Sequence, residues 1–246
     1  MRMSRSTVLW GAIGVAAVGV GAALVHKRRQ LRGAIGRGSA GPTPKLITKN
    51  PARMPLPTET IRVGDRTLTR YEAKDISIDE RLKLIQSRVW QGVNDPRVRQ
   101  LALKLTQGCG RDDGPCEAQR IFEAVKAKVR YTGDVGPVKN PKTGVVEGID
   151  YYQNPMVTWE YGGGDCDDAT GLIGALLAVI GHTVRLRVSS ETRFADWSHI
   201  YPVTLLPKDR PGKAVAVDIT LPWSNARAGS EARYGKARDY VIEAPA

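Results

Sequence analysis

Three residues with the chemistry for covalent acyl transfer follow one another along the chain: Cys166, His199 and Asp218. Cys166 stands at the start of an apolar stretch that predicts a helix, and the other two lie in stretches that predict strands. A cysteine thiolate can attack an amide carbonyl when a histidine accepts its proton and a carboxylate orients that histidine. The order of the three residues, on three separate elements, predicts a Cys-His-Asp triad.

The residues around Cys166 both favour and oppose its ionisation. A cysteine thiol has an ordinary pKa of about 8.5, and the first turn of a helix favours the thiolate through unpaired N–H groups and the helix dipole. The glycines at 162–164 let the chain turn sharply and let a substrate backbone approach. Asp165, Asp167 and Asp168 oppose the thiolate by their charge. We therefore expect these carboxylates to point away from the sulfur as helix caps, with an imidazolium against it.

The histidine of the triad follows by elimination, because the chain has three histidines. His26 lies beside an apolar amino-terminal segment, and His182 lies in a helix-to-strand turn where we expect it to be exposed. His199 opens a predicted strand and is the base. Asp218 lies in an apolar run, where a charge is unusual unless it is paired, so we expect it to bind the far nitrogen of His199. Each residue alone has an ordinary structural interpretation, and the joint pattern is what favours catalysis.

Charge sets the amino-terminal part apart from the rest of the chain. The 246 residues carry a formal net charge of +12, from 37 basic and 25 acidic residues. Ten of the basic residues and none of the acidic ones precede Glu59, which leaves 27 basic against 25 acidic residues in the remainder. Because that remainder has no basic stripe with interleaved aromatic residues, we expect no specific nucleic-acid partner.

Residues 7–25 contain no charged side chain and predict a single transmembrane helix. Nineteen helical residues reach about 28 Å, close to the thickness of the hydrocarbon core of a bilayer. Trp10 at one end and the basic residues 27–29 at the other are typical interface anchors. The alternative is a cleaved signal peptide, which the length of the segment and the basic residues after it disfavour.

The side of the membrane on which the domain lies stays open. The basic residues at 27–32 favour a cytoplasmic domain. Cys109 and Cys116 bracket a short turn and could form a disulfide, which persists in oxidising compartments; two free thiols are the alternative, and a metal site lacks further ligands nearby. Association with a virion or a host envelope is compatible with either side.

Composition and periodicity predict four parts: an anchor with its basic flank (1–32), a flexible linker (33–57), a helical extension (58–116) and the catalytic domain (117–246). Helices are expected at 77–93, 98–105, 117–129 and 167–180, and strands at 184–188, 199–206, 214–219 and, as an edge strand, 239–242. A short hairpin is expected over 61–70, and residues 131–152 are expected to form a long functional loop. Helices followed by antiparallel strands predict an α+β fold.

The residues around the triad resemble the transglutaminase-like superfamily. Residues 162–188 read GGGDCDDATGLIGALLAVIGHTVRLRV, residues 198–203 read SHIYPV and residues 216–220 read AVDIT. The resemblance covers about 117–220 and includes the helix that leads into Tyr131 and the pair Asn154-Pro155. It implies a papain-like cysteine protease fold, with Cys166 as nucleophile on the central helix, and with His199 as base and Asp218 as orienter on adjacent strands. The doubled aspartate after the cysteine is similar to versions in bacterial and bacteriophage genomes.

The remaining parts of an active site are less sharply marked. The backbone N–H of Cys166 is a natural oxyanion donor, and Gln153 or Trp159 could supply a second one. Trp159 has an alternative interpretation as a core or groove aromatic, and Trp197 is a candidate for the acyl groove. The triad requires no metal and no cofactor.

The sequence thus favours a membrane-anchored cysteine enzyme that acts on an amide bond of a peptide or protein. We expect a peptidase or amidase rather than a transamidase, because nothing marks an amine-binding site. The alternatives are a catalytically inactive transglutaminase-like binding or structural module, and a phage or cell-envelope assembly factor in which the anchor and the basic arm matter most. Neither the substrate nor the oligomeric state is predicted.

Overall fold

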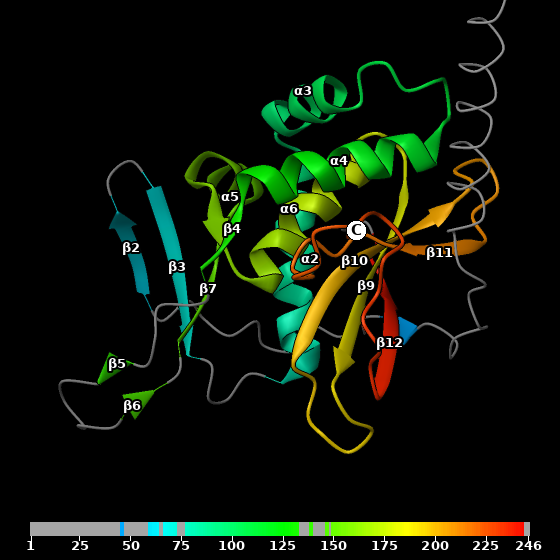
Figure 1. Cartoon of the computed structure of the whole chain (residues 1–246). Coiled ribbons are helices and arrows are strands. Elements are labelled where there is room, and N and C mark those ends of the chain that lie inside the picture. Colours follow the sequence, from blue (N-terminus) through cyan, green and yellow to red (C-terminus); the bar gives the residue numbers. More distant parts are fainter. Residues whose placement is uncertain are drawn as a thin grey trace, which may run out of the picture. The chain divides into compact units, whose positions relative to one another are not determined.

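The computed structural model describes residues 45–46, 59–63, 66–72, 77–132, 138–139, 146–147 and 149–243 (Figure 1). The chain divides into two units, Met1–Arg37 and Gly38–Ala246, and all described residues belong to the second. The predicted transmembrane segment at 7–25 lies outside them. Among the described helices, none has the length and apolar character that a bilayer crossing requires.

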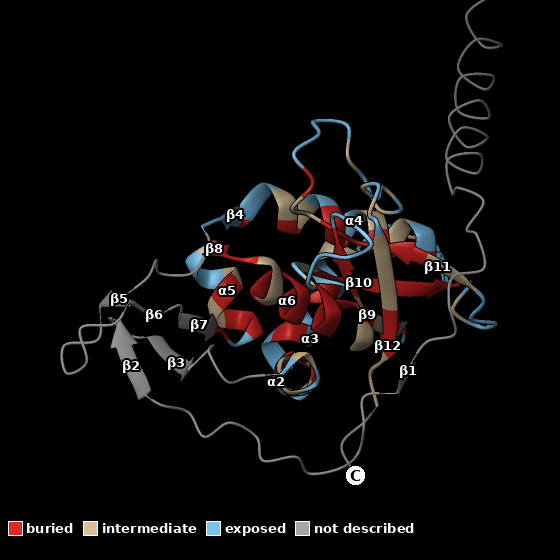
Figure 2. Ribbon diagram, turned by 90° about the horizontal axis from the view of Figure 1, so that it is seen from below, coloured by how far each residue is buried: buried red, intermediate tan, exposed pale blue. Residues whose placement is uncertain are grey.

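Helix α6, Cys166–Ala178, is the centre of the fold. Its apolar side chains are fully buried, among them Leu172, Ile173, Leu176 and Leu177. Four further helices pack around it: α2 (Ile78–Val93), α3 (Pro96–Leu105), α4 (Gly114–Lys128) and α5 (Pro155–Tyr161). Figure 2 shows buried residues along α6 and exposed ones on the outer faces of α2 and α4. A helix surrounded in this way needs apolar residues on all its faces, and the sequence of α6 supplies them.

The approach of α2 to α6 depends on a glycine. A Cβ on Gly92 would lie 2.5 Å from the Cβ of Ala175, which is too close for any larger residue. The residues of α2 and α3 share the buried clusters of α6, including Leu82, Leu84 and Val98. Val98 of α3 and Ile121 of α4 belong to the same buried cluster, and the predicted division of the chain at residue 116 stays a prediction.

Short polar side chains begin the helices, as sequence patterns predict. Ser77 accepts a hydrogen bond from the N–H of Glu80, whose carboxylate accepts one from the N–H of Ser77 in return, and the two bonds form a capping box. Asp95 caps α3 and Asp113 caps α4, which therefore begins three residues before the predicted start at Glu117.

A five-stranded sheet packs against the helices in the order β1 (Lys45–Leu46), β12 (Lys236–Val241), β9 (Thr183–Ser190), β10 (His199–Leu206) and β11 (Lys213–Ala216). The pairs β12–β9, β9–β10 and β10–β11 are antiparallel, and β1 pairs with β12 in parallel. β12 is therefore not the edge that the sequence predicts, because β1 covers its outer side.

The faces of this sheet alternate along each strand. Val184, Leu186 and Val188 of β9 enter the clusters that contain the helices. Tyr201 and Val203 of β10 form a smaller cluster with Ala216 on the other face. Because of this alternation, each residue next to one of these along its strand faces the opposite side of the sheet.

The remaining strands form three small sheets (Figure 1). β2 (Glu59–Val63), β3 (Arg66–Glu72) and β7 (Ile149–Tyr152) form one; β4 (Arg130–Tyr131) and β8 (Gly163–Gly164) another; β5 (Val138–Lys139) and β6 (Val146–Glu147) the third. The antiparallel pair β2–β3 confirms the hairpin predicted over 61–70. The short strands β5, β6 and β7 lie within 131–152, where the sequence predicts only a loop, and helix α5 follows this segment.

Helices and an antiparallel sheet around one core confirm the predicted α+β class. The strand predicted at 214–219 ends at Ala216, so Asp218 lies after the strand and not within it. The backbone pairing with β10 ends at this point. The N–H of Val217 still donates to the carbonyl of Pro202, whereas Asp218 forms its hydrogen bonds through its side chain.

Candidate active site

His199 and Asp218 form a hydrogen-bonded pair. The His199 Nε2 atom lies 2.9 Å from Oδ2 of Asp218. Asp218 is 1% exposed, whereas the His199 side chain is 18% exposed, so the pair has a buried carboxylate end and an open imidazole end. Because Nε2 contacts the carboxylate, Nδ1 is the ring nitrogen that is directed elsewhere. This is the arrangement that an oriented general base needs.

The carboxylate of Asp218 has further partners. Thr220 donates to Oδ1 from its backbone N–H at 3.0 Å and from its hydroxyl at 2.7 Å. The hydroxyl of Tyr234 lies 3.5 Å from Oδ2, beside the imidazole. Burial by itself would raise the pKa of Asp218, but the hydrogen bond and charge of His199, together with the donors of Thr220, hold that pKa below its ordinary value. Asp218 is therefore an anion at neutral pH.

Tyr234 and Tyr201 form the wall behind the imidazole. The rings of His199 and Tyr201 stack with centroids 5.3 Å apart, and Tyr234 lies 5.9 Å from Tyr201. Burial, and next the charge of Asp218, raise the pKa of Tyr234 to about 12, so it keeps its proton and can only donate toward the carboxylate. The ring of His199 is thus fixed by stacking as well as by hydrogen bonding.

A partly exposed ionic network supports this wall. The Tyr201 hydroxyl donates to Glu231 at 2.6 Å, and Glu231 pairs with Arg187. Arg187 also forms a two-pronged contact with Asp239 of β12. Burial would lower the pKa of Arg187, yet its two carboxylate partners raise it, so the guanidinium stays charged. The network joins β9, β10 and β12 beneath the imidazole.

Cys166 is the first residue of α6 and is partly buried. Asp165 caps the helix, because its side chain accepts from the N–H groups of Asp167 and Asp168. The hydroxyl of Thr170, one turn along, contacts the carbonyl of Cys166 at 2.6 Å and that of Ile200 at 3.2 Å. The first turn of α6 is thereby tied to the residue next to His199.

A small hollow lies beside the helix start. It is lined by Val129, Tyr131, Gly164, Asp165, Ala169, Ile219 and Thr220. The hollow therefore runs from the residues just before the cysteine to the threonine that holds Asp218. Its lining combines the apolar residues Val129, Ala169 and Ile219 with the polar residues Asp165 and Thr220.

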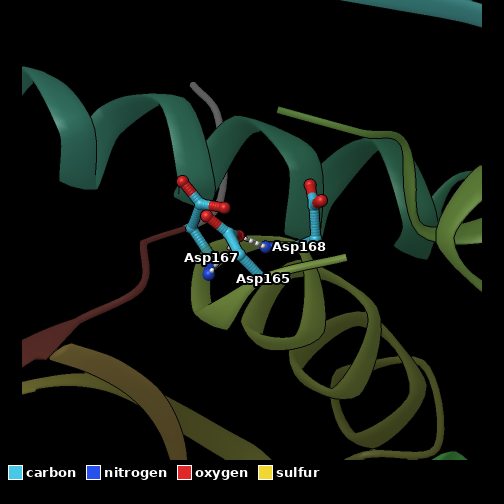
Figure 3. A group of neighbouring side chains, drawn as sticks. All are labelled: Asp165, Asp167 and Asp168. Carbon is cyan, nitrogen blue, oxygen red and sulfur yellow. Dashed lines mark hydrogen bonds between the residues drawn. The ribbon is translucent and has the colours of Figure 1, made fainter. Parts of the chain in front are cut away.

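Three carboxylates gather at the start of α6 (Figure 3). One oxygen from each of Asp165, Asp167 and Asp168 lies within 4.8 Å of the others. Oxygen ligands of this kind suit a hard cation such as Ca²⁺. They also have structural roles, because Asp165 caps the helix as predicted and Asp168 holds Gln153. Burial, and next the hydrogen bond with Asp165, raise the pKa of Asp167 well above its ordinary value, which favours a neutral carboxyl there.

Gln153 is braced against Asp168. Its backbone N–H donates to Oδ1 of Asp168 at 2.7 Å, and its side-chain amide donates to Oδ2 at 2.6 Å and to the carbonyl of Gly163 at 3.2 Å. Both amide hydrogens are thus engaged, and an oxyanion would have to displace one of these acceptors. The role of oxyanion donor stays a prediction for Gln153.

The two tryptophan candidates lie in different places. Trp159, on α5, packs against the main core cluster and has Lys128 over its ring at 5.2 Å, in agreement with its alternative interpretation as a core aromatic. Trp197 precedes His199 by two residues and packs against the cluster that Cys166 also contacts. Trp197 is thus the candidate that shares surroundings with the cysteine.

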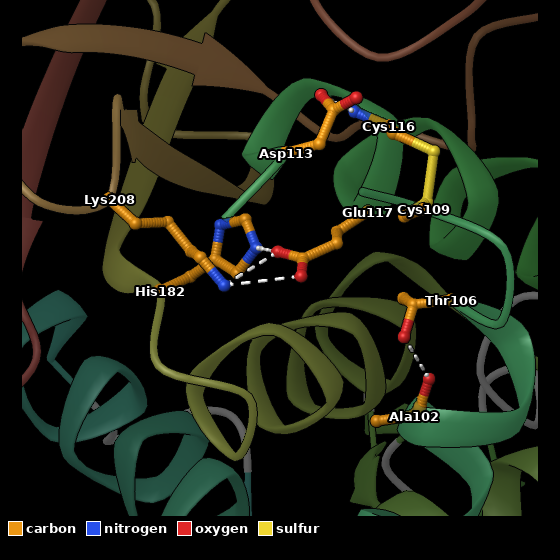
Figure 4. The surroundings of a disulfide bond; sticks show 8 residues. All are labelled: Ala102, Thr106, Cys109, Asp113, Cys116, Glu117, His182 and Lys208. Carbon is orange, nitrogen blue, oxygen red and sulfur yellow. Dashed lines mark hydrogen bonds and ion pairs between the residues drawn. A yellow bond between two sulfur atoms is a disulfide. The ribbon is translucent and has the colours of Figure 1, made fainter. Parts of the chain in front are cut away.

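His182 is buried, so its predicted exposure is wrong. Its Nδ1 lies 2.7 Å from the Thr204 hydroxyl and its Nε2 lies 2.8 Å from Glu117, which also binds Lys208 (Figure 4). Burial lowers the pKa of His182, and the hydrogen bond that its ring donates to the Glu117 carboxylate offsets part of that effect. The sequence pattern gave no sign of this pairing, because Glu117 is 65 positions away.

Cys109 and Cys116 are joined in a disulfide, one of the alternatives that the sequence left open. The bond closes the turn between α3 and α4 and lies next to Glu117 (Figure 4). Cys166 is consequently the free cysteine of the chain.

Sequence reasoning missed Thr220 and Tyr234. Thr220 stands two residues after Asp218, and a hydroxyl at that spacing from an aspartate is a recognisable turn pattern. Tyr234 comes from the irregular segment before β12, where no periodicity marks it. Both contact Asp218 only because β11 ends early and the chain turns there.

Comparison with known proteins gives similarities to solved structures, among them the two that follow, whereas no family model and no curated protein matches the chain. Calcium-bound LapG of Legionella pneumophila is 16% identical, with a TM-score of 0.34, over 59% of this chain and 74% of that one. A Cytophaga hutchinsonii protein described as a cysteine protease candidate is 14% identical, with a TM-score of 0.38, over 70% of this chain and 60% of that one. The chain thus spans less than two thirds of the second protein.

Proposed function

We propose that the chain is a membrane-anchored cysteine enzyme of transglutaminase-like type that opens an amide bond with Cys166, His199 and Asp218. The observation that carries the proposal is the pair of His199 and Asp218, with its buried, fully bonded carboxylate and its more open imidazole. A carboxylate that holds one ring nitrogen of a histidine fixes the tautomer and orientation that a general base needs.

The position of Cys166 supports the role of nucleophile. The start of a helix favours a thiolate, and the bond from Thr170 to Ile200 ties this turn to the strand that His199 opens. Nδ1 of His199 is the ring nitrogen that faces away from Asp218. It would therefore be the atom that exchanges a proton with Sγ.

The reaction would proceed in two balanced halves. Sγ of Cys166 attacks the carbonyl carbon while His199 accepts the thiol proton, and the same imidazolium gives that proton to the departing amine as the C–N bond breaks. Water then attacks the thioester, loses a proton to His199 and releases the acid with the free thiol. The backbone N–H of Cys166 would stabilise the oxyanion in both halves.

We propose hydrolysis of a peptide or protein rather than transfer to an amine. The sequence carries no mark of an amine-binding site. Among the residues that line the hollow beside the helix start, Asp165 is the carboxylate, and it is engaged as the cap of α6. A transamidase would be recognised by a stimulation of turnover by added amine.

Residues 7–25 would tether this domain to a membrane, and the disulfide favours an oxidising compartment for it. This placement runs against the basic residues at 27–32, whose charge favours the cytoplasm. Fractionation and protease digestion of intact cells, with a tag at the carboxyl end, test both parts. Protection of the tag from external protease in cells with a permeabilised outer layer would contradict the oxidising side.

Catalysis is tested by the rate at which Cys166 is alkylated, and not only by whether Cys166 is labelled. Because Cys166 is the free cysteine, loss of labelling in Cys166→Ala shows only where a thiol reagent reacts. We expect His199→Ala, which retains Cys166, to lower the rate of Cys166 alkylation by iodoacetamide near neutral pH by about tenfold or more. His182→Gln is the matched control, since it alters a histidine outside the site. Equal rates in wild type and His199→Ala would contradict the enzyme and leave the inactive binding module.

A further inference from the structure

Two cations share one tryptophan ring beside the candidate active site. Nζ of Lys236 lies 4.6 Å from the ring centroid of Trp197, and the guanidinium carbon of Arg238 lies 5.5 Å from it. All three side chains are partly exposed. We call Trp197, Lys236 and Arg238 together the Trp197 platform.

The platform is on the same side of the sheet as Cys166. Lys236 and Arg238 are two positions apart on β12 and therefore point to one face. Arg238 pairs with Val188 of β9, a member of the cluster against which Cys166 and Trp197 both pack. Side chains of directly paired residues share a face, so the two cations and the cysteine border one cluster.

The charge of the platform is not neutralised within the protein. Over the described part of the chain, neither Lys236 nor Arg238 has a carboxylate partner. The neighbouring loop carries Glu191, Arg193 and Asp196, all exposed, and none of them pairs with the two cations. A ring face attracts a cation but accepts no conventional hydrogen bond, so the N–H donors of both side chains remain for a ligand.

The platform is also held in place. Gly235 donates its N–H to the carbonyls of Ser190 and Glu191, at 2.9 Å and 3.1 Å. A Cβ on Gly235 would lie 2.3 Å from the backbone of Thr192, so the start of β12 lies directly against this loop. Ser198 is tied back to Ser189 at 3.0 Å, next to His199. A binding surface that is already fixed before its ligand arrives loses less conformational entropy when the ligand binds.

We propose that the Trp197 platform binds an acidic side chain of the polypeptide on which Cys166 acts. The inference rests on the proposed function for the identity of the site, but the binding itself is measurable without catalysis. Arg238 can form a two-pronged contact with a carboxylate, and Lys236 adds a second charge. A single-stranded nucleic acid would use similar chemistry, but the ring of Trp197 already carries two cations, which leaves it less surface for a stacked base.

The test uses the full chain in detergent with two fluorescein-labelled, C-terminally amidated peptides, tetraglutamate and tetraglutamine. Binding to Cys166→Ala is followed by fluorescence anisotropy, with the platform variant Lys236→Gln/Arg238→Gln in the same background. The basic residues that precede Glu59 would also attract a polyanion, so the matched control is Lys104→Gln/Arg120→Gln. It removes the same charge from exposed positions on α3 and α4.

We expect tetraglutamate to bind more tightly than tetraglutamine, and the platform variant to lose about tenfold in affinity for tetraglutamate relative to the control. Equal affinities for the two peptides, or equal losses in the platform and control variants, would overturn the proposal. If the platform variant lost more affinity for a labelled tetrathymidylate than for tetraglutamate, the proposal would be overturned in favour of a nucleic-acid ligand.

A second measurement separates this inference from the proposed function. In the chain with Cys166 intact, tetraglutamate should slow the alkylation of Cys166 by iodoacetamide, whereas tetraglutamine should not. A tetraglutamate complex that leaves the alkylation rate unchanged would place the platform outside the path to Cys166 and overturn the substrate role. Failure of His199→Ala to alter that rate would contradict the enzyme alone, because the peptide affinities do not depend on it.

Discussion

The hydroxyl of Thr220 donates to Oδ1 of Asp218 at 2.7 Å, the carboxylate oxygen that His199 does not use. The same hydroxyl lies 3.3 Å from Nε2 of His199. Thr220 therefore holds the second carboxylate oxygen while its hydroxyl also lies beside the imidazole. It touches both members of the pair without being positioned to react.

Thr220→Val removes this donor and keeps the shape of the side chain. We expect the rate of Cys166 alkylation near neutral pH to fall by up to about tenfold, because such a hydrogen bond is worth about 0.5–1.5 kcal/mol and 1.36 kcal/mol is a factor of ten. Thr106→Val is the matched control, since the Thr106 hydroxyl bonds only within α3, to the carbonyl of Ala102. A rate that is unchanged in Thr220→Val, or lowered equally in both variants, would remove Thr220 from the site.

The sequence predicts α6 and its surroundings well because local signals agree there. The apolar run, the cap Asp165 and the stop at Gly181, whose φ is +90°, all lie within one short stretch. The predicted strand 199–206 also coincides with β10. Helix α5 was missed because seven residues are too few to carry a helical period.

The contacts that complete the site could not be predicted in the same way. Tyr234 reaches Asp218 across 16 positions and His182 reaches Glu117 across 65, so no local spacing records either contact. The burial of His182 reverses the expectation from its turn, because a turn residue is exposed only if no other element covers it. α4 covers it here.

Gly164 must lack a side chain for the brace of Gln153 to form. A Cβ at this position would lie 2.7 Å from the Cβ of Asp168 and 2.8 Å from its Oδ2. We expect Gly164→Ala to lower the free energy of unfolding by about 1–3 kcal/mol and to slow Cys166 alkylation, because Asp168 must move. Urea unfolding measures the first effect. Gly110→Ala is the control, since its Cβ would meet its nearest neighbour, Asp113, at 3.8 Å; equal losses in the two variants would contradict the crowding.

The disulfide between Cys109 and Cys116 closes a short loop, with a sequence separation of 7. We expect Cys109→Ser/Cys116→Ser to lose about 2 kcal/mol of unfolding free energy, because a loop of this length restricts the unfolded chain by roughly that amount. Urea unfolding without reductant measures it, and Cys166→Ser is the control. Mass spectrometry after denaturation in N-ethylmaleimide should find one modified cysteine without reductant and three with it. Three modified cysteines in both conditions would show that the bond does not form.

His182 makes the stability of the fold depend on pH. Its pKa is lowered in the folded state, so the unfolded chain takes up a proton first as the pH falls below about 6.5. Above that pH, this group should therefore leave the free energy of unfolding unchanged. Below it, the free energy of unfolding should decline until the pH reaches the lower pKa of the folded state. We expect the melting temperature of His182→Gln to fall less steeply between pH 7 and pH 5 than that of the wild type. Thr204→Val is the control, because it removes the partner of Nδ1 but keeps the imidazole, and so should lose stability while it keeps the wild-type slope. If the melting temperatures of wild type and His182→Gln fell equally between pH 7 and pH 5, the acid sensitivity would belong to other groups.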